Sequence, residues 1–136
     1  MGKKHILIVE DDEVLTKLYG QVLAMQLPQY SFTTVTNGVE ALDVLRKTQC
    51  DLVITDLNMP LLDGDELYRQ ALEMSSKESR EMPAFIFCSA LRRALDSVRE
   101  TCTGTRDHFI LKPFKWQQVC DIIIAELERD LPCASC

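Results

Sequence analysis

The stretch LVITDLNMP, residues 52–60, places an apolar run directly before a carboxylate. Leu52 to Thr55 is aliphatic and β-branched, which is typical of a buried strand. Asp56 follows this run and lies a few residues before Pro60, so its charge stands at the end of a core element. Because burial of an unpaired carboxylate is costly, the pattern indicates that Asp56 faces a partner such as a cation.

Similar apolar runs lie on both sides of this stretch and alternate with segments of helical periodicity. We predict strands over residues 5–10, 31–36, 51–55, 84–89 and 108–111. We predict helices over residues 12–27, 38–49, from about 63 onward, 90–100 and 116–129. The apolar side of the first helix is predicted to hold Val14, Leu15, Leu18, Val22, Leu23 and Met25.

This alternation predicts the fold class. Strands that alternate with helices form βαβ units with right-handed crossovers, and hence a parallel sheet covered on both faces. Five units are too few for a barrel of eight strands. We therefore predict an α/β doubly wound parallel sheet of flavodoxin-like (βα)5 type, with strand order 2-1-3-4-5 and ligands bound beyond the carboxyl ends of the strands.

Composition narrows the functional classes. The 136 residues suit one domain, and the net charge of -6 argues against direct binding to nucleic acid or to an anionic membrane. No apolar run has the length of a signal peptide core or of a membrane span. The six cysteines are widely spread, so we expect a reducing, cytoplasmic setting. Cys50 and Cys88 are expected to pack as small apolar residues, and His5 and His108 to be edge or surface residues.

The terminal Cys133 and Cys136 have the spacing of a metal-binding or redox pair. A single CxxC without a second pair is a weak signal, so we favour an inert tail.

Four of the predicted strands end in polar residues: the first in Glu10, Asp11 and Asp12, the third in Asp56, the fourth in Ser89, and the fifth in Lys112 before Pro113. With strands one and three adjacent, their acids converge and repel each other unless a cation lies among them. An oxygen-only cluster suits Mg²⁺. Asp56 is then a candidate phosphoryl acceptor, with Ser89 and Lys112 as candidate contacts to phosphoryl oxygens. Asp12 is expected to cap the first helix.

Four motifs, VEDDE, TDLNMP, FCSA and LKPF, occur in order after these strands. Together they resemble the receiver domain of bacterial two-component response regulators, the CheY-like fold, over about residues 4–128. The resemblance implies that Asp56 is the phosphoacceptor and that Mg²⁺ is bound by Glu10, Asp11, Asp56 and the backbone carbonyl of Asn58. It also implies that Ser89 is the switch hydroxyl, that Lys112 binds phosphate next to a cis peptide bond to Pro113, and that Phe109 is the switch aromatic.

The same resemblance implies a signalling phosphoacceptor rather than an enzyme. Its phosphodonor is expected to be a sensor histidine kinase or a histidine phosphotransfer protein, and its output an unknown protein or effector domain reached through the fourth helix, fifth strand and fifth helix. We expect the receiver domain to span residues 1–130 and to be followed by a short tail, 131–136, without an effector domain. Two departures are noted: Phe109 lacks a tyrosine hydroxyl, and the segment before the fifth strand is about one residue longer than usual.

Three alternatives stay open. A flavodoxin-like cofactor binder is disfavoured because the acids after strand one repel phosphate. A Mg²⁺-dependent phosphatase with an Asp nucleophile is disfavoured because residues 11–15 lack the Gly and Thr of D-x-D-G-T. A pseudo-receiver, a binding module without phosphotransfer, is disfavoured by the full set of acid, hydroxyl and lysine.

Overall fold

The computed structural model of the protein describes residues 3–59, 61–102 and 106–129. One parallel sheet has the strand order β2-β1-β3-β4-β5, as predicted. Its strands are β1 (His5–Val9), β2 (Ser31–Val35), β3 (Leu52–Asp56), β4 (Ala84–Ser89) and β5 (His108–Leu111). The near-continuous burial of β1, β3 and β4 reflects helices on both faces of the sheet.

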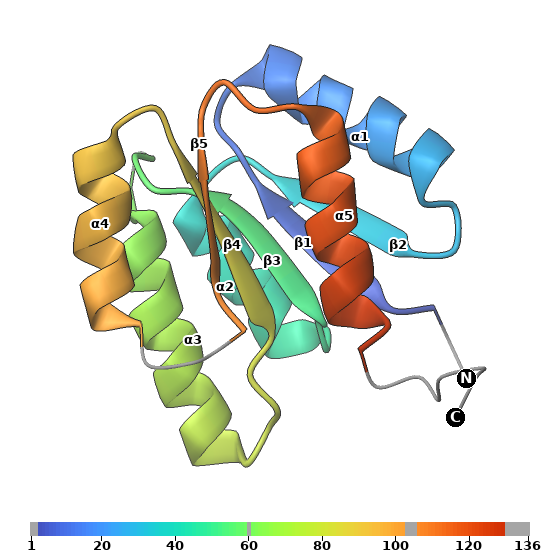
Figure 1. The fold of residues 1–136 in the computed structure, drawn as a ribbon. Helices are drawn as coiled ribbons and strands as arrows, with labels where there is room; N and C mark the ends of the chain where they lie inside the picture. Colours follow the sequence, from blue (N-terminus) through green and yellow to red (C-terminus); the bar gives the residue numbers. More distant parts are fainter. Residues whose placement is uncertain (1–2, 60, 103–105, 130–136) are drawn as a thin grey trace.

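The helices are α1 (Glu13–Gln26), α2 (Gly38–Lys47), α3 (Gly64–Glu78), α4 (Arg92–Thr101) and α5 (Trp116–Leu127). Figure 1 shows α1 and α5 on one face of the sheet and α2, α3 and α4 on the other. Each face has its own apolar core, one centred on Ile8, Tyr19 and Ile123 and the other on Val53, Leu67 and Phe87. Within the described residues, no helix has the length and apolar character needed to cross a membrane.

Caps fix where two helices begin. The Asp12 carboxylate accepts hydrogen bonds from the N–H groups of Val14 and Leu15, which confirms the predicted cap of α1. Asn37 caps α2 in the same way through the N–H of Glu40. By contrast, α4 begins two residues later than predicted, because Leu91 is still extended and occupies the cap position.

The buried face of α1 differs from the predicted one. Leu23 is fully buried, but Val14, Leu18 and Met25 are 69%, 39% and 79% exposed. Tyr19 takes the central place instead, packing edge-on against Trp116 with its hydroxyl 3.8 Å from the sulfur of Cys88. The prediction counted aliphatic residues and passed over a tyrosine whose ring reaches the core.

Cys50 and Cys88 are buried as expected. His108 lies on the edge strand β5. The prediction for His5 was wrong: it lies on an inner strand, half-buried, with its ring nitrogens 2.7 Å from the hydroxyls of Ser31 and Thr33. The terminal CxxC pair, the tail 131–136, Pro60 and the inner part of the lengthened segment, 103–105, lie outside the described residues.

Candidate functional site

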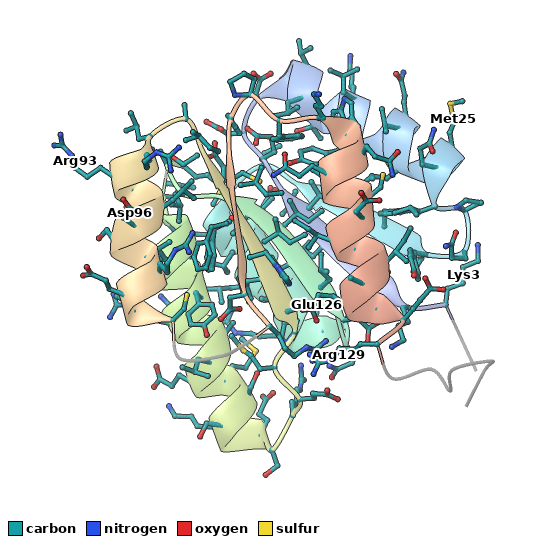
Figure 2. The ribbon with its side chains drawn as sticks, viewed as in Figure 1. Lys3, Met25, Arg93, Asp96, Glu126 and Arg129 are labelled. Carbon is teal, nitrogen blue, oxygen red and sulfur yellow. The ribbon has the colours of Figure 1, made fainter. Side chains whose placement is uncertain are left out.

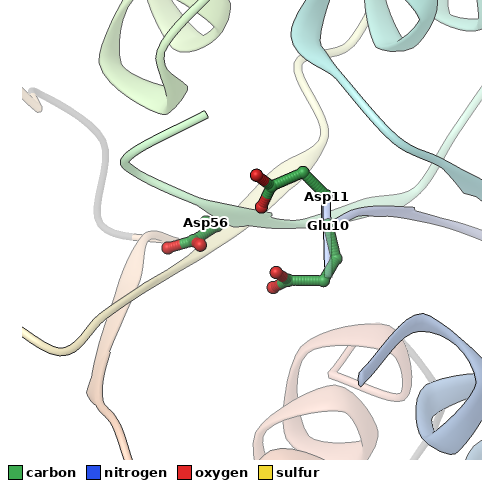
Figure 3. Close-up of side chains that lie close together, drawn as sticks. All are labelled: Glu10, Asp11 and Asp56. Carbon is green, nitrogen blue, oxygen red and sulfur yellow. The ribbon is translucent and has the colours of Figure 1, made fainter. Parts of the chain in front are cut away.

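The carboxyl ends of β1 and β3 bring three acids together. Glu10 and Asp11 follow β1, and Asp56 is the last residue of β3. One oxygen from each of the three carboxylates lies within 4.8 Å of the others. Figure 3 shows the three side chains gathered around one space beyond the ends of the strands. The sequence prediction that these acids converge is therefore confirmed.

Lys112 reaches the same space from the end of β5. Its Nζ donates to Oε2 of Glu10 at 3.2 Å and to Oδ2 of Asp56 at 3.3 Å. The peptide bond that follows it, to Pro113, is cis, as the family resemblance implied. The lysine thus bridges two carboxylates that lie at the ends of different strands.

Burial and charge act against each other on these groups. Burial raises the pKa of Glu10, and the neighbouring ammonium of Lys112 opposes that rise without cancelling it. Burial raises the pKa of Asp56 in the same way, again against Lys112. For Lys112, burial alone lowers the pKa, but the carboxylates of Glu10 and Asp56 outweigh it and raise the pKa. The single ammonium of Lys112 therefore does not fully offset the burial of the two carboxylates.

The donor set fits a hard divalent cation. Carboxylate oxygens are the ligands that Mg²⁺ prefers, and it keeps several waters that a phosphate oxygen can replace. Asp11 is exposed and Glu10 is almost fully buried, so solvent reaches the cluster at Asp11. Such a site can hold a cation against Asp56 and admit an anionic group from solvent.

Ser89 and Phe109 lie on the strands next to the acids. Ser89, the last residue of β4, is 1% exposed, and its Oγ accepts a hydrogen bond from the N–H of Leu91 at 3.0 Å. Phe109 on β5 is half-buried and stacks on Phe87 with ring centroids 5.6 Å apart. Ser89 therefore lies beside the acidic cluster, and Phe109 lies on the neighbouring edge strand, in contact with the core.

Asn58 is exposed in the loop after β3, two residues beyond Asp56. Two residues that were not singled out from the sequence also fix this loop. The hydroxyl of Thr55 donates to the backbone carbonyl of Asp56 at 2.9 Å. Gly64, the first residue of α3, lies so close that an added Cβ would stand 2.6 Å from that same carbonyl oxygen. The sequence indicated Gly64 by its place at the start of a predicted helix.

Comparison with known proteins agrees with this geometry. The family model described as the response regulator receiver domain matches residues 6–124. Among curated proteins, the transcriptional regulatory protein GlrR of Escherichia coli strain K12 is 34% identical over 128 residues, which are 94% of this chain and 27% of that protein. The chain thus spans about a quarter of the length of this relative.

Solved structures show the same fold. The signal receiver domain of a signal transduction histidine kinase from Syntrophus aciditrophicus has a TM-score of 0.77 and 30% identity, with 98% of this chain and 96% of that chain covered. The receiver domain of Ssk1 from Saccharomyces cerevisiae, crystallised with the phosphotransfer protein Ypd1, has a TM-score of 0.79 at 20% identity, with 96% and 93% covered.

Proposed function

Because this chain belongs to the response regulator receiver domain family, homologous to phosphoacceptor domains of two-component systems, we propose that Asp56 accepts a phosphoryl group and that the domain works as a switch. The observation that carries this proposal is the cluster of Glu10, Asp11 and Asp56, bridged by Lys112. Asp56 is the member that lies at the end of the central strand, and it contacts Lys112 at 3.3 Å.

In the proposed transfer, a carboxylate oxygen of Asp56 attacks the phosphorus of a phosphohistidine. The P–N bond breaks, the histidine nitrogen takes up a proton, and an aspartyl phosphate forms. The Lys112 ammonium, already within hydrogen-bond distance of Asp56, is in place to pair with a phosphoryl oxygen. The hydroxyl of Ser89 supplies a further donor after its side chain turns toward the group.

Mg²⁺ is the cation that we propose for the acidic cluster. Glu10, Asp11, Asp56 and the backbone carbonyl of Asn58 would hold it, and when bound it neutralises charge that builds up on the phosphoryl oxygens. Without such a cation, the negative phosphoryl donor would meet three carboxylates and a single ammonium. The proposed phosphorylation is therefore expected to need a divalent cation.

We propose a sensor histidine kinase or a histidine phosphotransfer protein as the donor, by analogy with the Ypd1 complex of Ssk1. The output is proposed to run through α4, β5 and α5 to an unidentified protein or effector domain. We further propose a cytoplasmic location, a signalling role without enzymatic turnover of a substrate, and a receiver domain that extends over residues 1–130.

The test is intact-mass spectrometry after incubation with acetyl phosphate, with and without Mg²⁺. The wild-type protein is expected to gain one phosphoryl group only when Mg²⁺ is present. The variant Asp56→Asn is expected to gain none, and Asp51→Asn serves as the matched control because Asp51 lies at the other end of β3. A domain that gains no phosphoryl group under any condition and does not bind Mg²⁺ is a pseudo-receiver instead.

A further inference from the structure

The ring of Phe109 is held between two groups. The fully buried Phe87 stacks on it from the core, with an angle of 19° between the ring planes. From the solvent side, the guanidinium carbon of Arg99 lies 4.5 Å from the ring centroid. Arg99 comes from α4 and Phe109 from β5, so this contact joins the two elements at the surface.

The guanidinium contacts the ring although α4 carries an acidic residue at a spacing that permits an ion pair. Asp96 lies three residues before Arg99 on α4, a spacing at which helical side chains can meet, and Figure 2 shows Asp96 on the outer side of the helix. Across the described ranges, Arg99 nevertheless forms no ion pair. A planar guanidinium stacks on an aromatic face better than an ammonium does, so the residue type suits the contact.

The sheet register shows where the ring can go. Phe87 pairs with Phe109, and two pairs further along Ser89 pairs with Leu111, so Ser89 and Phe87 share one face of β4. If the Ser89 hydroxyl turns toward the phosphoryl group, as proposed above, the space that it leaves lies on the same face of the sheet as the Phe109 ring. A Phe109 ring that turns toward this space must leave the guanidinium.

We propose that Arg99 is a positioning residue that holds Phe109 in the unmodified state and is released when Asp56 is phosphorylated. This inference rests on the proposed function. On release, the cation becomes free at the surface of α4, where Arg92 and Arg93 are also exposed. The position of positive charge at the surface of α4 would thus change, and this change does not require a displacement of the helix axis.

The first test follows the Nε–H group of Arg99 by NMR before and after treatment with acetyl phosphate and Mg²⁺, with the mass of the same sample measured in parallel. In the unmodified protein the ring current of Phe109 should shift the Arg99 signals upfield. After phosphorylation these signals should move toward the values of a free arginine. A gained phosphoryl group with unmoved Arg99 signals overturns the inference, whereas the absence of a gained phosphoryl group identifies a failure of the proposed function itself.

The second test uses variants of α4. Arg99→Ala removes the contact and should shift the balance between the two Phe109 positions by about two- to five-fold, the equilibrium effect of an exposed cation–π contact. The Phe109 ring signals of the unmodified variant should therefore move partway toward their phosphorylated positions. In Arg99→Lys the Phe109 ring signals should lie between those of Arg99→Ala and those of the wild type. In the matched control Arg93→Ala they should stay at their wild-type positions. Coincident ring signals in Arg99→Ala and wild type would exclude the positioning role.

Discussion

The ammonium nitrogen of Lys112 lies 3.2 Å from Oε2 of Glu10, although 102 residues separate them in the chain. The Glu10 side chain is only 3% exposed, so the lysine is the cation that this carboxylate meets in the metal-free protein. The lysine therefore already supplies positive charge to the space in which we place Mg²⁺.

Removal of Lys112 should strengthen the binding of Mg²⁺. The ammonium repels a divalent cation and competes with it for Glu10 and Asp56, so Lys112→Ala is expected to raise the affinity about ten-fold. Calorimetric titration of Mg²⁺ measures this effect. Lys115→Ala is the matched control, because Lys115 is exposed and, among the described residues, forms no ion pair. An unchanged or weaker affinity in Lys112→Ala would contradict the competition.

The same variant should lose the response to phosphorylation. Without the ammonium, the phosphoryl group has no charged contact at the end of β5, so Lys112→Ala is expected to accept the group but to leave β5 and α5 unchanged. Amide NMR shifts of residues 108–127, compared before and after labelling, test this expectation. A shift pattern equal to that of the wild type would refute the coupling role of Lys112.

Asp11→Ala should weaken Mg²⁺ binding at least about ten-fold, the cost typical of losing even an outer partner of a metal site, and should slow phosphorylation accordingly. The fold should survive because Asp11 is exposed. Asp12→Asn removes a neighbouring charge but keeps the cap of α1, and is expected to stay close to wild type. Equal labelling of Asp11→Ala and wild type would defeat the assignment of Asp11 as a ligand.

Glu126 should stabilise the fold in a pH-dependent way. This nearly buried carboxylate, labelled with Arg129 in Figure 2, accepts hydrogen bonds from Arg106 at 3.1 Å and from His108 at 2.7 Å. Burial alone would raise the pKa of Glu126, but these partners hold it below its ordinary value of 4.5. Because the folded-state pKa is lowered, the stabilisation is present above about pH 4.5 and is lost as the pH falls through the folded value.

Urea unfolding of Glu126→Gln tests this prediction. At pH 7 the variant should lose about 2 kcal/mol of unfolding free energy, the range for hydrogen bonds to a charged group. The difference from wild type should shrink as the pH is lowered below 4.5. Asp121→Asn on the exposed side of α5 is the control, and a difference that stays constant with pH would rule out the ionised carboxylate as the cause.

Gly64→Ala should disturb the acidic site through the backbone. Its Cβ would stand 2.6 Å from the carbonyl oxygen of Asp56 and 3.1 Å from Cα of Leu57, and backbone atoms cannot yield cheaply. We expect a loss of about 1–3 kcal/mol in unfolding free energy, as for overpacking, together with slower phosphorylation. Gly20→Ala is the control: it lies inside α1 with nothing within 4 Å of the added carbon, and should stabilise by about 0.5–1 kcal/mol.

The site could be predicted because it depends on topology. Parallel strands place their carboxyl ends at one edge, so Asp11, Asp56 and Lys112 needed only correct strand assignments and strand order to be brought together. The strands themselves were recognisable because burial on both faces leaves continuous apolar runs.

Side-chain contacts across the fold were not predictable in this way. Glu126 and Arg106 are 20 residues apart, and no spacing rule links a late helix to the segment before β5. The contact of Arg99 with Phe109 could not be predicted either. An arginine on a helix usually lies in solvent and a phenylalanine on a strand usually packs in the core, so neither residue indicates the other. Exposure of Val14 and Met25 depends on how α1 is rotated against the sheet, which Tyr19 decides by its size.

Because β5 lies at the edge of the sheet, its displacement costs less free energy than that of an inner strand. It is an edge strand that pairs with β4 alone, whereas β3, which carries Asp56, pairs with both β1 and β4. A displacement of β5 therefore strains one ladder of hydrogen bonds, while a displacement of β3 strains two. A structural change that begins at Asp56 on the central strand therefore costs the least free energy when the edge strand β5 moves. At this edge a neighbouring molecule can contact the rearranged surface.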